Sequence, residues 1–268
     1  NKRGLINTIV TNGYMRPEPL EELCKYLDAA TVDFKAGANR EFYNNRIRIQ
    51  LSAAVPEIIP GCCGGYAYVT DGSDGLRIID VSDPTNPIEV SYYDTPGSAR
   101  GIFVDNNYAY VADGASGLHI INISNASNPR LVGVGIYDTT YFAYDVSVLG
   151  DYAYVVGSNE LGPDFIVFDI SDRTNPTVVA NNDWSGLDII ISGSYAYVAG
   201  GFNGLWIIDI SEPSFPILVS TYNNVCYAQS ISINNYYAYI ADCDSGLVII
   251  DVLNNSNPRF AGRFITSR

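Results

Sequence analysis

Hydrophobic and polar residues alternate in a pattern that repeats along most of the chain. A run reading Tyr-Ala-Tyr-Val or Tyr-Ala-Tyr-Ile begins at Tyr66, Tyr108, Tyr152, Tyr195 and Tyr237, at intervals of 42, 44, 43 and 42 residues. Each is followed by a second apolar run that ends in Asp or Asn: Leu76–Asp80, Leu118–Asn122, Phe165–Asp169, Leu205–Asp209 and Leu247–Asp251. Several short strands within a fixed repeat of this length predict a β-propeller or a similar array.

The second copy of the repeat shows how one unit divides into strands. We expect strands over residues Ala99–Val104, Tyr108–Ala112, Gly117–Ile123 and Arg130–Gly133. Asp105-Asn-Asn107 separates the first two, and these residues tolerate the positive φ of a tight hairpin. One repeat therefore predicts one four-stranded antiparallel blade.

The third strand of each unit is apolar on both sides, as in Leu118, Ile120, Ile121 and Ile123. A sheet with one solvated face would alternate, whereas a strand covered on both faces need not. Blades sandwiched between neighbours meet that requirement. A β-sandwich is the alternative, but it would not repeat its residues at a fixed period. The prediction is a mainly β chain that forms a five-bladed β-propeller of ~42-residue repeats, with a short N-terminal β-α-β fragment.

The amino-acid sequence of the third strand resembles a known repeat. Leu247-Val-Ile-Ile-Asp251, with the runs that start at Leu76 and Leu205, resembles the LVIVD repeat family of bacterial and archaeal proteins. The resemblance covers residues 66 to about 264. It implies a β-propeller, commonly in surface or exported proteins, with no shared catalytic activity. No signal peptide is visible in the chain.

The first 65 residues follow a different pattern. Short β-like runs at Ile6–Val10 and Thr31–Lys35 flank Glu18–Leu27, whose apolar residues have helical spacing. This order predicts one strand–helix–strand unit. We therefore divide the chain into a fragment at residues 1–50, a junction at 51–65 and a propeller at 66–268. The fragment is too small to be an independent domain.

Residues 4–43 resemble a middle section of radical S-adenosylmethionine enzymes of the pyruvate formate-lyase activating type. In that family Thr-Asn-Gly closes a barrel strand, and the Asp-x-Lys of a later strand lies near the cofactor. The resemblance implies cofactor-binding roles for Asn12, Asp33 and Lys35. The C-x3-C-x2-C motif that holds the iron–sulfur cluster of these enzymes is absent from this chain. We therefore expect no cofactor and interpret the segment as a remnant or a misjoined piece.

Charge separates the same two regions. Residues 1–65 hold 8 Lys and Arg against 7 Asp and Glu, whereas residues 66–268 hold 7 against 22 and contain no lysine. An acidic surface of this kind repels phosphate backbones, so we expect no nucleic-acid partner. No stretch of 18 apolar residues occurs, so no transmembrane segment is expected.

The residues that could carry chemistry do not form a catalytic or metal-binding pattern. The five cysteines lack C-x2-C spacing, and His119 is the only histidine. No nucleophile-and-base pattern surrounds His119, so we interpret it as a packing residue. The Asp that ends the third strand recurs in four copies, and Asn122 replaces it in the second. Because every blade needs a turn there, we expect these side chains to shape the turn rather than bind a metal.

The remaining candidates lie in loops. The loops between the second and third strands, and the segments that lead into each first strand, should share one rim of the propeller. They supply acidic and aromatic candidates for a ligand-binding face: Asp71, Asp74, Asp113, Tyr141, Phe142, Trp184, Asp242 and Asp244. Such a face could bind a peptide, a sugar or a cation. The sequence favours a non-catalytic binding or scaffold module for a protein, peptide or glycan. The alternatives are a fragment of a radical S-adenosylmethionine enzyme with a propeller extension, and a hydrolase that uses the acidic rim.

Two further expectations concern strand register. Residues upstream of Gly64-Gly65 lack the apolar pattern of a first strand, so we expect a first blade of three strands. Arg46–Leu51 alternates well enough to replace the missing strand, but its arginines suit a solvent-facing position. In the last copy, a tight turn at Asn235 and Tyr236 places Ala228 opposite Cys243 and makes Cys226 a near neighbour of Cys243.

Overall fold

The described part of the protein is all-β. The computed structural model describes residues 65–83, 85–137, 142–158, 165–242 and 246–265, together with the backbone of three earlier strands. Those strands are β1 (Thr8–Val10), β2 (Thr31–Phe34) and β3 (Ile47–Ala53). None of the described residues forms an apolar helix of membrane-spanning length.

Five successive sheets, here called blades 1 to 5, account for the other strands. Blade 1 contains β3 with β4 (Gly65–Thr70), β5 (Leu76–Asp80) and β6 (Ile88–Tyr93); blade 2 contains β7 (Gly101–Asp105), β8 (Tyr108–Ala112), β9 (Leu118–Asn122) and β10 (Arg130–Gly135). Blade 3 contains β11 (Phe142–Leu149), β12 (Tyr152–Ser158), β13 (Phe165–Asp169) and β14 (Thr177–Asn182). Blade 4 contains β15 (Asp188–Ser192), β16 (Tyr195–Ala199), β17 (Leu205–Asp209) and β18 (Ile217–Tyr222). Blade 5 contains β19 (Ala228–Asn234), β20 (Tyr237–Asp242), β21 (Gly246–Asp251) and β22 (Arg259–Phe264).

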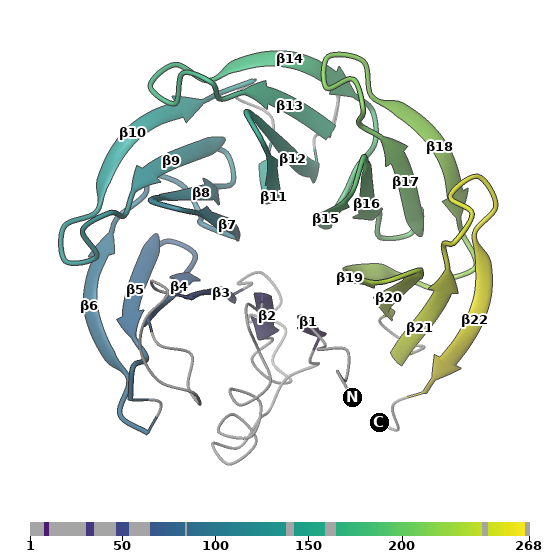
Figure 1. Ribbon diagram of the computed structural model, residues 1–268, viewed down its shortest axis with the longest axis horizontal. Coiled ribbons are helices and arrows are strands. Elements are labelled where there is room, and N and C mark those ends of the chain that lie inside the picture. Colours follow the sequence, from purple (N-terminus) through teal and green to yellow (C-terminus); the bar gives the residue numbers. More distant parts are fainter. Residues whose placement is uncertain are drawn as a thin grey trace.

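The blades follow one another around a common centre, with the first strand of each blade innermost and the fourth outermost (Figure 1). Neighbouring strands within each blade are antiparallel. The prediction of a mainly β chain with five blade-like sheets is therefore confirmed. The turn chemistry is confirmed as well, because Asn106 and Asn235 in two first hairpins have φ values of 50° and 54°.

The prediction of a three-stranded first blade is wrong. β3 pairs antiparallel with β4, from Arg48 opposite Thr70 to Ala53 opposite Gly65. The pairing gives β4 backbone partners along its inner edge, which would otherwise stay open. The need of β4 for backbone partners therefore outweighs the solvent-facing position that we expected for the arginines of this segment. The sheet continues beyond β3 to β2 and β1, so the first sheet crosses residue 50, where we ended the N-terminal fragment.

β1 and β2 pair in parallel, with Thr8 opposite Thr31. The predicted helix at 18–27, which would connect them, lies outside the described residues, as do Asn12 and Lys35. Asp33 lies in β2 and pairs with Val10 on one side and Arg48 on the other.

The predicted register of the last hairpin is also wrong at its end. A β-bulge between Ala228 and Ser230 places Ala228 opposite Asp242 rather than Cys243. The bulge adds one residue to β19, which turns the chain as it enters the blade. Cys243 lies outside the described residues, so its distance from Cys226 stays a prediction.

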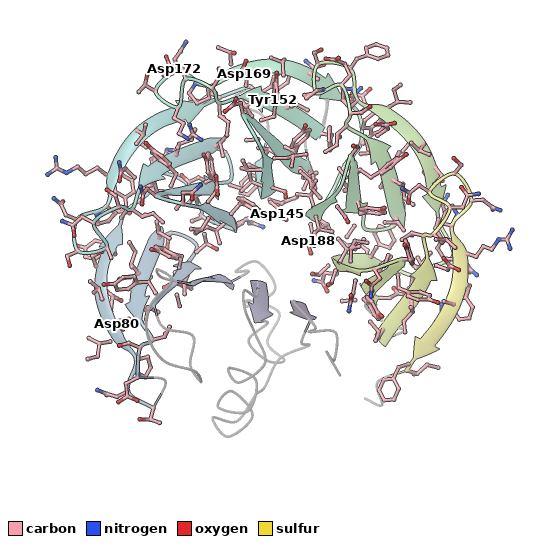
Figure 2. All side chains as sticks on the ribbon, in the orientation of Figure 1. Asp80, Asp145, Tyr152, Asp169, Asp172 and Asp188 are labelled. Atoms are coloured by element: carbon pink, nitrogen blue, oxygen red, sulfur yellow. The ribbon has the colours of Figure 1, made fainter. Side chains whose placement is uncertain are left out.

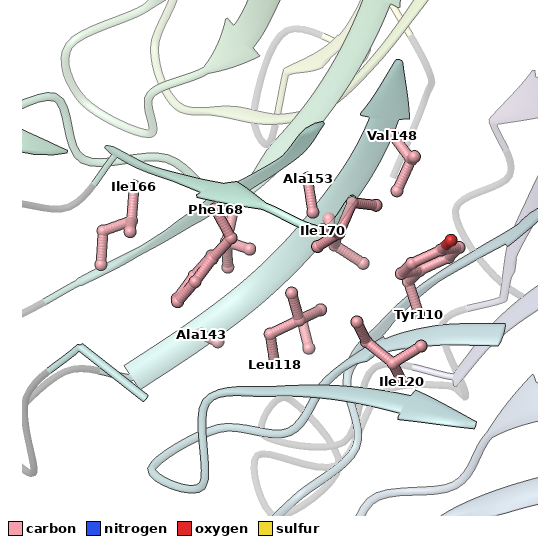
Figure 3. Packing of buried hydrophobic residues seen from close by; sticks show 12 residues of the cluster. Tyr110, Leu118, Ile120, Ala143, Val148, Ala153, Ile166, Phe168 and Ile170 are labelled. Atoms are coloured by element: carbon pink, nitrogen blue, oxygen red, sulfur yellow. The ribbon is translucent and has the colours of Figure 1, made fainter. Parts of the chain in front are cut away.

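Each blade buries its faces against its neighbours. Between blades 2 and 3 the contact includes Tyr110, Leu118 and Ile120 from one side and Val146 and Phe168 from the other, all nearly inaccessible to water (Figure 3). Equivalent clusters join blades 1 and 2, blades 3 and 4, and blades 4 and 5. This double burial explains why the third strands are apolar on both sides.

Polar contacts add to this packing where a turn of one blade reaches the blade before it. Arg173 Nε in blade 3 donates to the hydroxyl of Tyr110 in blade 2, at 2.9 Å. The hydroxyl of Tyr197 in blade 4 donates to Asn255 Oδ1 in blade 5, also at 2.9 Å. The turn of blade 4 has Pro213 at the equivalent position. In blade 3, burial raises the pKa of Tyr154 to about 12.

Replacing Arg173 by Met tests this polar contact between blades. We expect Arg173→Met to lower the free energy of unfolding by about 1–2 kcal/mol, because the part-buried Tyr110 hydroxyl loses a charged partner. Urea denaturation of Arg130→Met is the control, because Arg130 is exposed at the start of β10 and its loss should change little. Equal effects of the two substitutions would show that the hydrogen bond to Tyr110 contributes nothing specific.

Candidate functional site

Backbone hydrogen bonds join the blades along one rim. Gly72 and Ala99 exchange N–H···O bonds of 3.1 and 2.9 Å, and Gly201 and Ala228 exchange two of 2.9 Å. Gly114 forms the same bridge with Ala143. In each case the glycine lies between the second and third strands of one blade, and the alanine leads into the next blade. The predicted sharing of one rim is confirmed for these loops, and we call this surface the bridged rim.

Two of the predicted acidic candidates point into the protein. Asp113 and Asp242 are 0% and 1% exposed. Asp113 accepts hydrogen bonds from the Thr95 hydroxyl at 2.6 Å and the Gly97 N–H at 2.8 Å. Asp242 accepts from the N–H groups of Cys226 and Tyr227. These carboxylates therefore hold the segment that leads into their own blade, and burial raises the pKa of Asp113.

The first loop differs, because its acidic groups are more exposed. Asp71 and Asp74 both lie near the guanidinium of Arg77, with the closest N···O distance 3.1 Å to Asp74, and Glu89 lies 3.2 Å from the same side chain. Exposed ion pairs of this kind contribute little stability. Tyr141 and Asp244 lie outside the described residues.

Phe142 lies on the bridged rim in a cluster with Tyr144 and Arg100. The Arg100 guanidinium carbon is 4.6 Å from the centre of the Phe142 ring and 5.0 Å from that of Tyr144. A Cβ atom on Gly114 would lie only 2.9 Å from Phe142, so the ring packs directly over this glycine. Glycine adopts the φ of 56° of this turn without strain, and its lack of a Cβ atom leaves room for the ring.

Trp184, in contrast, is half-buried against the wall of blade 3. Its ring centre is 5.6 Å from that of Phe165, which is fully buried. The indole therefore contributes to packing between blades 3 and 4.

The sequence reasoning missed a second aromatic pair on the bridged rim. Phe202 lies in the loop of blade 4 and Tyr227 leads into blade 5; their ring centres are 4.7 Å apart at an interplanar angle of 78°. Phe202 is 82% exposed. A signal was present, since Phe202 follows a loop glycine where other copies have Ser73 and Ala115.

Two buried acidic residues near the centre were missed as well. Asp145 and Asp188 lie in first strands and are 1% and 4% exposed (Figure 2). Asp145 accepts the N–H of Ile189 at 2.9 Å, and Asp188 accepts the N–H of Ile231 at 2.8 Å. Each carboxylate thus bonds to the first strand of the next blade. An Asp in a mostly apolar first strand was the available signal.

The acidic residues that end the third strands shape turns, as predicted. Asp80, Asp169 and Asp209 each accept the N–H of the serine two residues later, and Asn122 does the same. Hydrogen bonds from the side chain and the backbone N–H of the same serine lower the pKa of each of the three carboxylates. Within the described residues, no group of His, Cys, Asp and Glu could hold a metal ion.

His119 lies in β9 of blade 2, opposite Val111 of β8, and is 2% exposed. Its Nδ1 is 3.7 Å from Asp113 Oδ2, which is too long for a hydrogen bond. The hydroxyl of Thr95 donates to the other oxygen of this carboxylate, Asp113 Oδ1, at 2.6 Å.

Comparisons with known proteins identify the repeat. The LVIVD repeat model matches five tandem segments, at residues 62–95, 96–139, 142–183, 185–224 and 226–266. No curated protein matches the sequence. The match begins at residue 62, so the radical S-adenosylmethionine resemblance of residues 4–43 has no support from it.

Solved structures similar to this chain are distant in sequence. The periplasmic gluconolactonase of Pseudomonas aeruginosa is 12% identical, with 82% of this chain and 77% of that chain covered and a TM-score of 0.63. A candidate 6-phosphogluconolactonase of Bacteroides uniformis is 11% identical, with 82% and 78% covered and a TM-score of 0.65. A functionally unknown protein from Desulfotomaculum acetoxidans is 14% identical, with 82% and 77% covered and a TM-score of 0.62. At these identities the likeness shows the fold alone.

The burial of His119 makes its titration a direct test of the core. Desolvation disfavours the charged imidazole and lowers the pKa of His119 from 6.5 to about 4. The folded state therefore binds a proton at His119 more weakly than the unfolded state does. The free energy of unfolding should decrease as the pH falls from 6.5 towards 4. Because the chain has one histidine, the NMR signals of its ring can be assigned directly. We expect a midpoint near 4; a midpoint at or above 6.5 would show that the charge of Asp113 outweighs burial.

Proposed function

The chain belongs to the LVIVD repeat family, and from this premise we propose that it is a non-catalytic binding or scaffold module. Its ligand is a protein, a peptide or a glycan, bound on the bridged rim. One observation carries the proposal. The rim presents Phe142 and Tyr227 over glycines of the preceding blade, at Gly114 and Gly201, while the acidic groups Asp113 and Asp242 face inward.

Aromatic rings on a rigid backbone suit recognition. They offer a large contact area at little entropic cost, because few torsions have to be fixed on binding. Function on repeat scaffolds of this kind usually lies in the loops of one face. The bridges at Gly114 and Gly201 already fix the backbone around both rings, so a ligand need not order these loops.

Two findings support a non-catalytic role. The one histidine is buried beside Asp113, and its Nδ1 has no hydrogen-bond partner among the described residues. The described residues also contain no group that could hold a metal. The lactonase names of two similar structures belong to those proteins and come with 11–12% identity to this chain.

Substitution of the rim rings tests the proposal. Wild-type protein is screened against a glycan array and a peptide array, and each ligand found is retested on Phe142→Ser/Tyr227→Ser. We expect the double variant to bind about tenfold more weakly or worse, because both rings lie on the rim. Phe215→Ser is the matched control: Phe215 is 71% exposed but lies beyond the third strand, at the opposite rim. Circular dichroism confirms that each variant is folded.

Two results would count against this function. One is the absence of any ligand on both arrays. The other is turnover of gluconolactone or 6-phosphogluconolactone above the uncatalysed rate, which would make the protein an enzyme despite its buried histidine.

A second candidate is a fragment of a radical S-adenosylmethionine enzyme that carries a propeller extension. The parallel pairing of β1 and β2 favours it, since strand–helix–strand units of α/β enzymes have parallel strands. The genomic sequence upstream of residue 1 tests it. An in-frame C-x3-C-x2-C motif there would support this candidate, and a stop codon or an unrelated sequence would exclude it.

A further inference from the structure

Phe202 is the most exposed large hydrophobic residue of the described chain, although its loop is well fixed. The Gly200 N–H donates to the Gly204 carbonyl at 2.7 Å, and the Asn203 N–H donates to the Gly200 carbonyl at 3.0 Å. Gly201 adds the two backbone bonds of the bridge to Ala228. The exposure therefore does not come from a loosely held segment.

The turn itself does not require an aromatic residue. The equivalent loops of blades 1 and 2 close with the same bonds, from Asp71 N–H to the Gly75 carbonyl and from Asp113 N–H to the Gly117 carbonyl. Their residues at the position of Phe202 are Ser73 and Ala115. The turn therefore does not need the phenyl ring. The ring exposes apolar surface, which is unfavourable in water unless a ligand or partner covers it.

Phe202 and Tyr227 together form an aromatic notch. The 78° angle between the rings turns their two planes nearly at right angles. The ring of Tyr227 packs over Gly201: a Cβ atom on this glycine would lie 3.3 Å from Tyr227 Cε2. The Asp242 carboxylate also accepts the backbone N–H of Tyr227, at 2.6 Å. The notch is therefore formed before any ligand binds.

The groups around the notch are polar but uncharged. The two segments that carry the rings, 200–204 and 223–229, contain no Asp, Glu, Lys or Arg. They supply the amides of Asn203, Asn223, Asn224 and Gln229, and the Asn203 amide lies 3.3 Å from the Ser185 hydroxyl. The carboxylate of Asp242 is 1% exposed and bonded to backbone, so it does not add charge to this surface.

We propose that this aromatic notch binds a neutral oligosaccharide. The C–H groups on one face of a sugar ring are weakly positive and pack against the negative face of an aromatic ring. The hydroxyl groups at its edge are neutral donors and acceptors, which match amides and a hydroxyl. A charged ligand would find no counter-ion among these residues, and the chain's net charge of −14 repels polyanions. The inference rests on the proposed binding role of the bridged rim and names its ligand class.

The test uses the whole chain and defined probes. Binding of cellohexaose, maltohexaose and chitohexaose to the wild type is measured by isothermal titration calorimetry. Four variants are compared: Phe202→Ser, Tyr227→Ser, Phe202→Trp and the opposite-rim control Phe215→Ser. We expect at least one probe to bind, with about tenfold or greater loss in the two notch serine variants. Phe202→Trp should retain binding, because it keeps an aromatic face, and Phe215→Ser should match the wild type. Because Ser73 stands at the position of Phe202 in blade 1, we expect Phe202→Ser to fold, and circular dichroism checks that each variant is folded.

Three outcomes separate this inference from the proposed function. Sugar binding that survives Phe202→Ser would place the saccharide elsewhere and overturn the notch. Binding of an array peptide that is lost in the notch variants, without binding of any of the three sugars, would overturn the ligand class but retain the rim's binding role. Absence of both sugar and peptide binding would overturn the inference and the proposed function together.

Discussion

Burial of one blade against the next is the interaction on which the rest of the structure depends. The third strands carry apolar side chains on both faces, so a single sheet would leave half of them in water. Successive packing removes that exposure, as the cluster between blades 2 and 3 shows. Carboxylates of Asp145 and Asp188 and the Arg173 guanidinium add directional bonds between blades. The repeat thereby fixes both the distance and the orientation of its neighbours.

The rim follows from the same packing. Once two blades are placed, the loop of one lies beside the segment that enters the next, and backbone bonds such as those between Gly201 and Ala228 join them. The glycines leave room for rings from the following blade, at Phe142 and Tyr227. A binding surface can therefore change through side chains such as Phe202, while the backbone that presents them is kept by the repeat.

Much of this could be predicted from the sequence, because repetition reports strands, turns and double burial directly. The positive φ of Asn106 and the turn-shaping role of Asp80 are local properties, so pattern alone indicates them. The predictions were wrong where pairing between strands, rather than the local sequence, determines the position of a residue. Backbone pairing with β4 places residues 47–53 in blade 1, and a bulge shifts Ala228 by one residue. Asp113 was predicted to lie on a ligand-binding face, yet its carboxylate turns inward and accepts the N–H of Gly97, a contact that its acidity alone does not reveal.

The claim that neighbouring blades hold a rigid, preformed rim is tested most directly by hydrogen exchange of its bridging amides. The N–H groups of Ala99, Ala143, Gly201 and Ala228 each donate across a blade boundary. The account predicts that they exchange nearly as slowly as strand amides such as Tyr110, and far more slowly than Gly193 in an exposed hairpin turn. Exchange of the bridging amides at the rate of Gly193 would contradict it, because the loops would then be independent of the blades beside them.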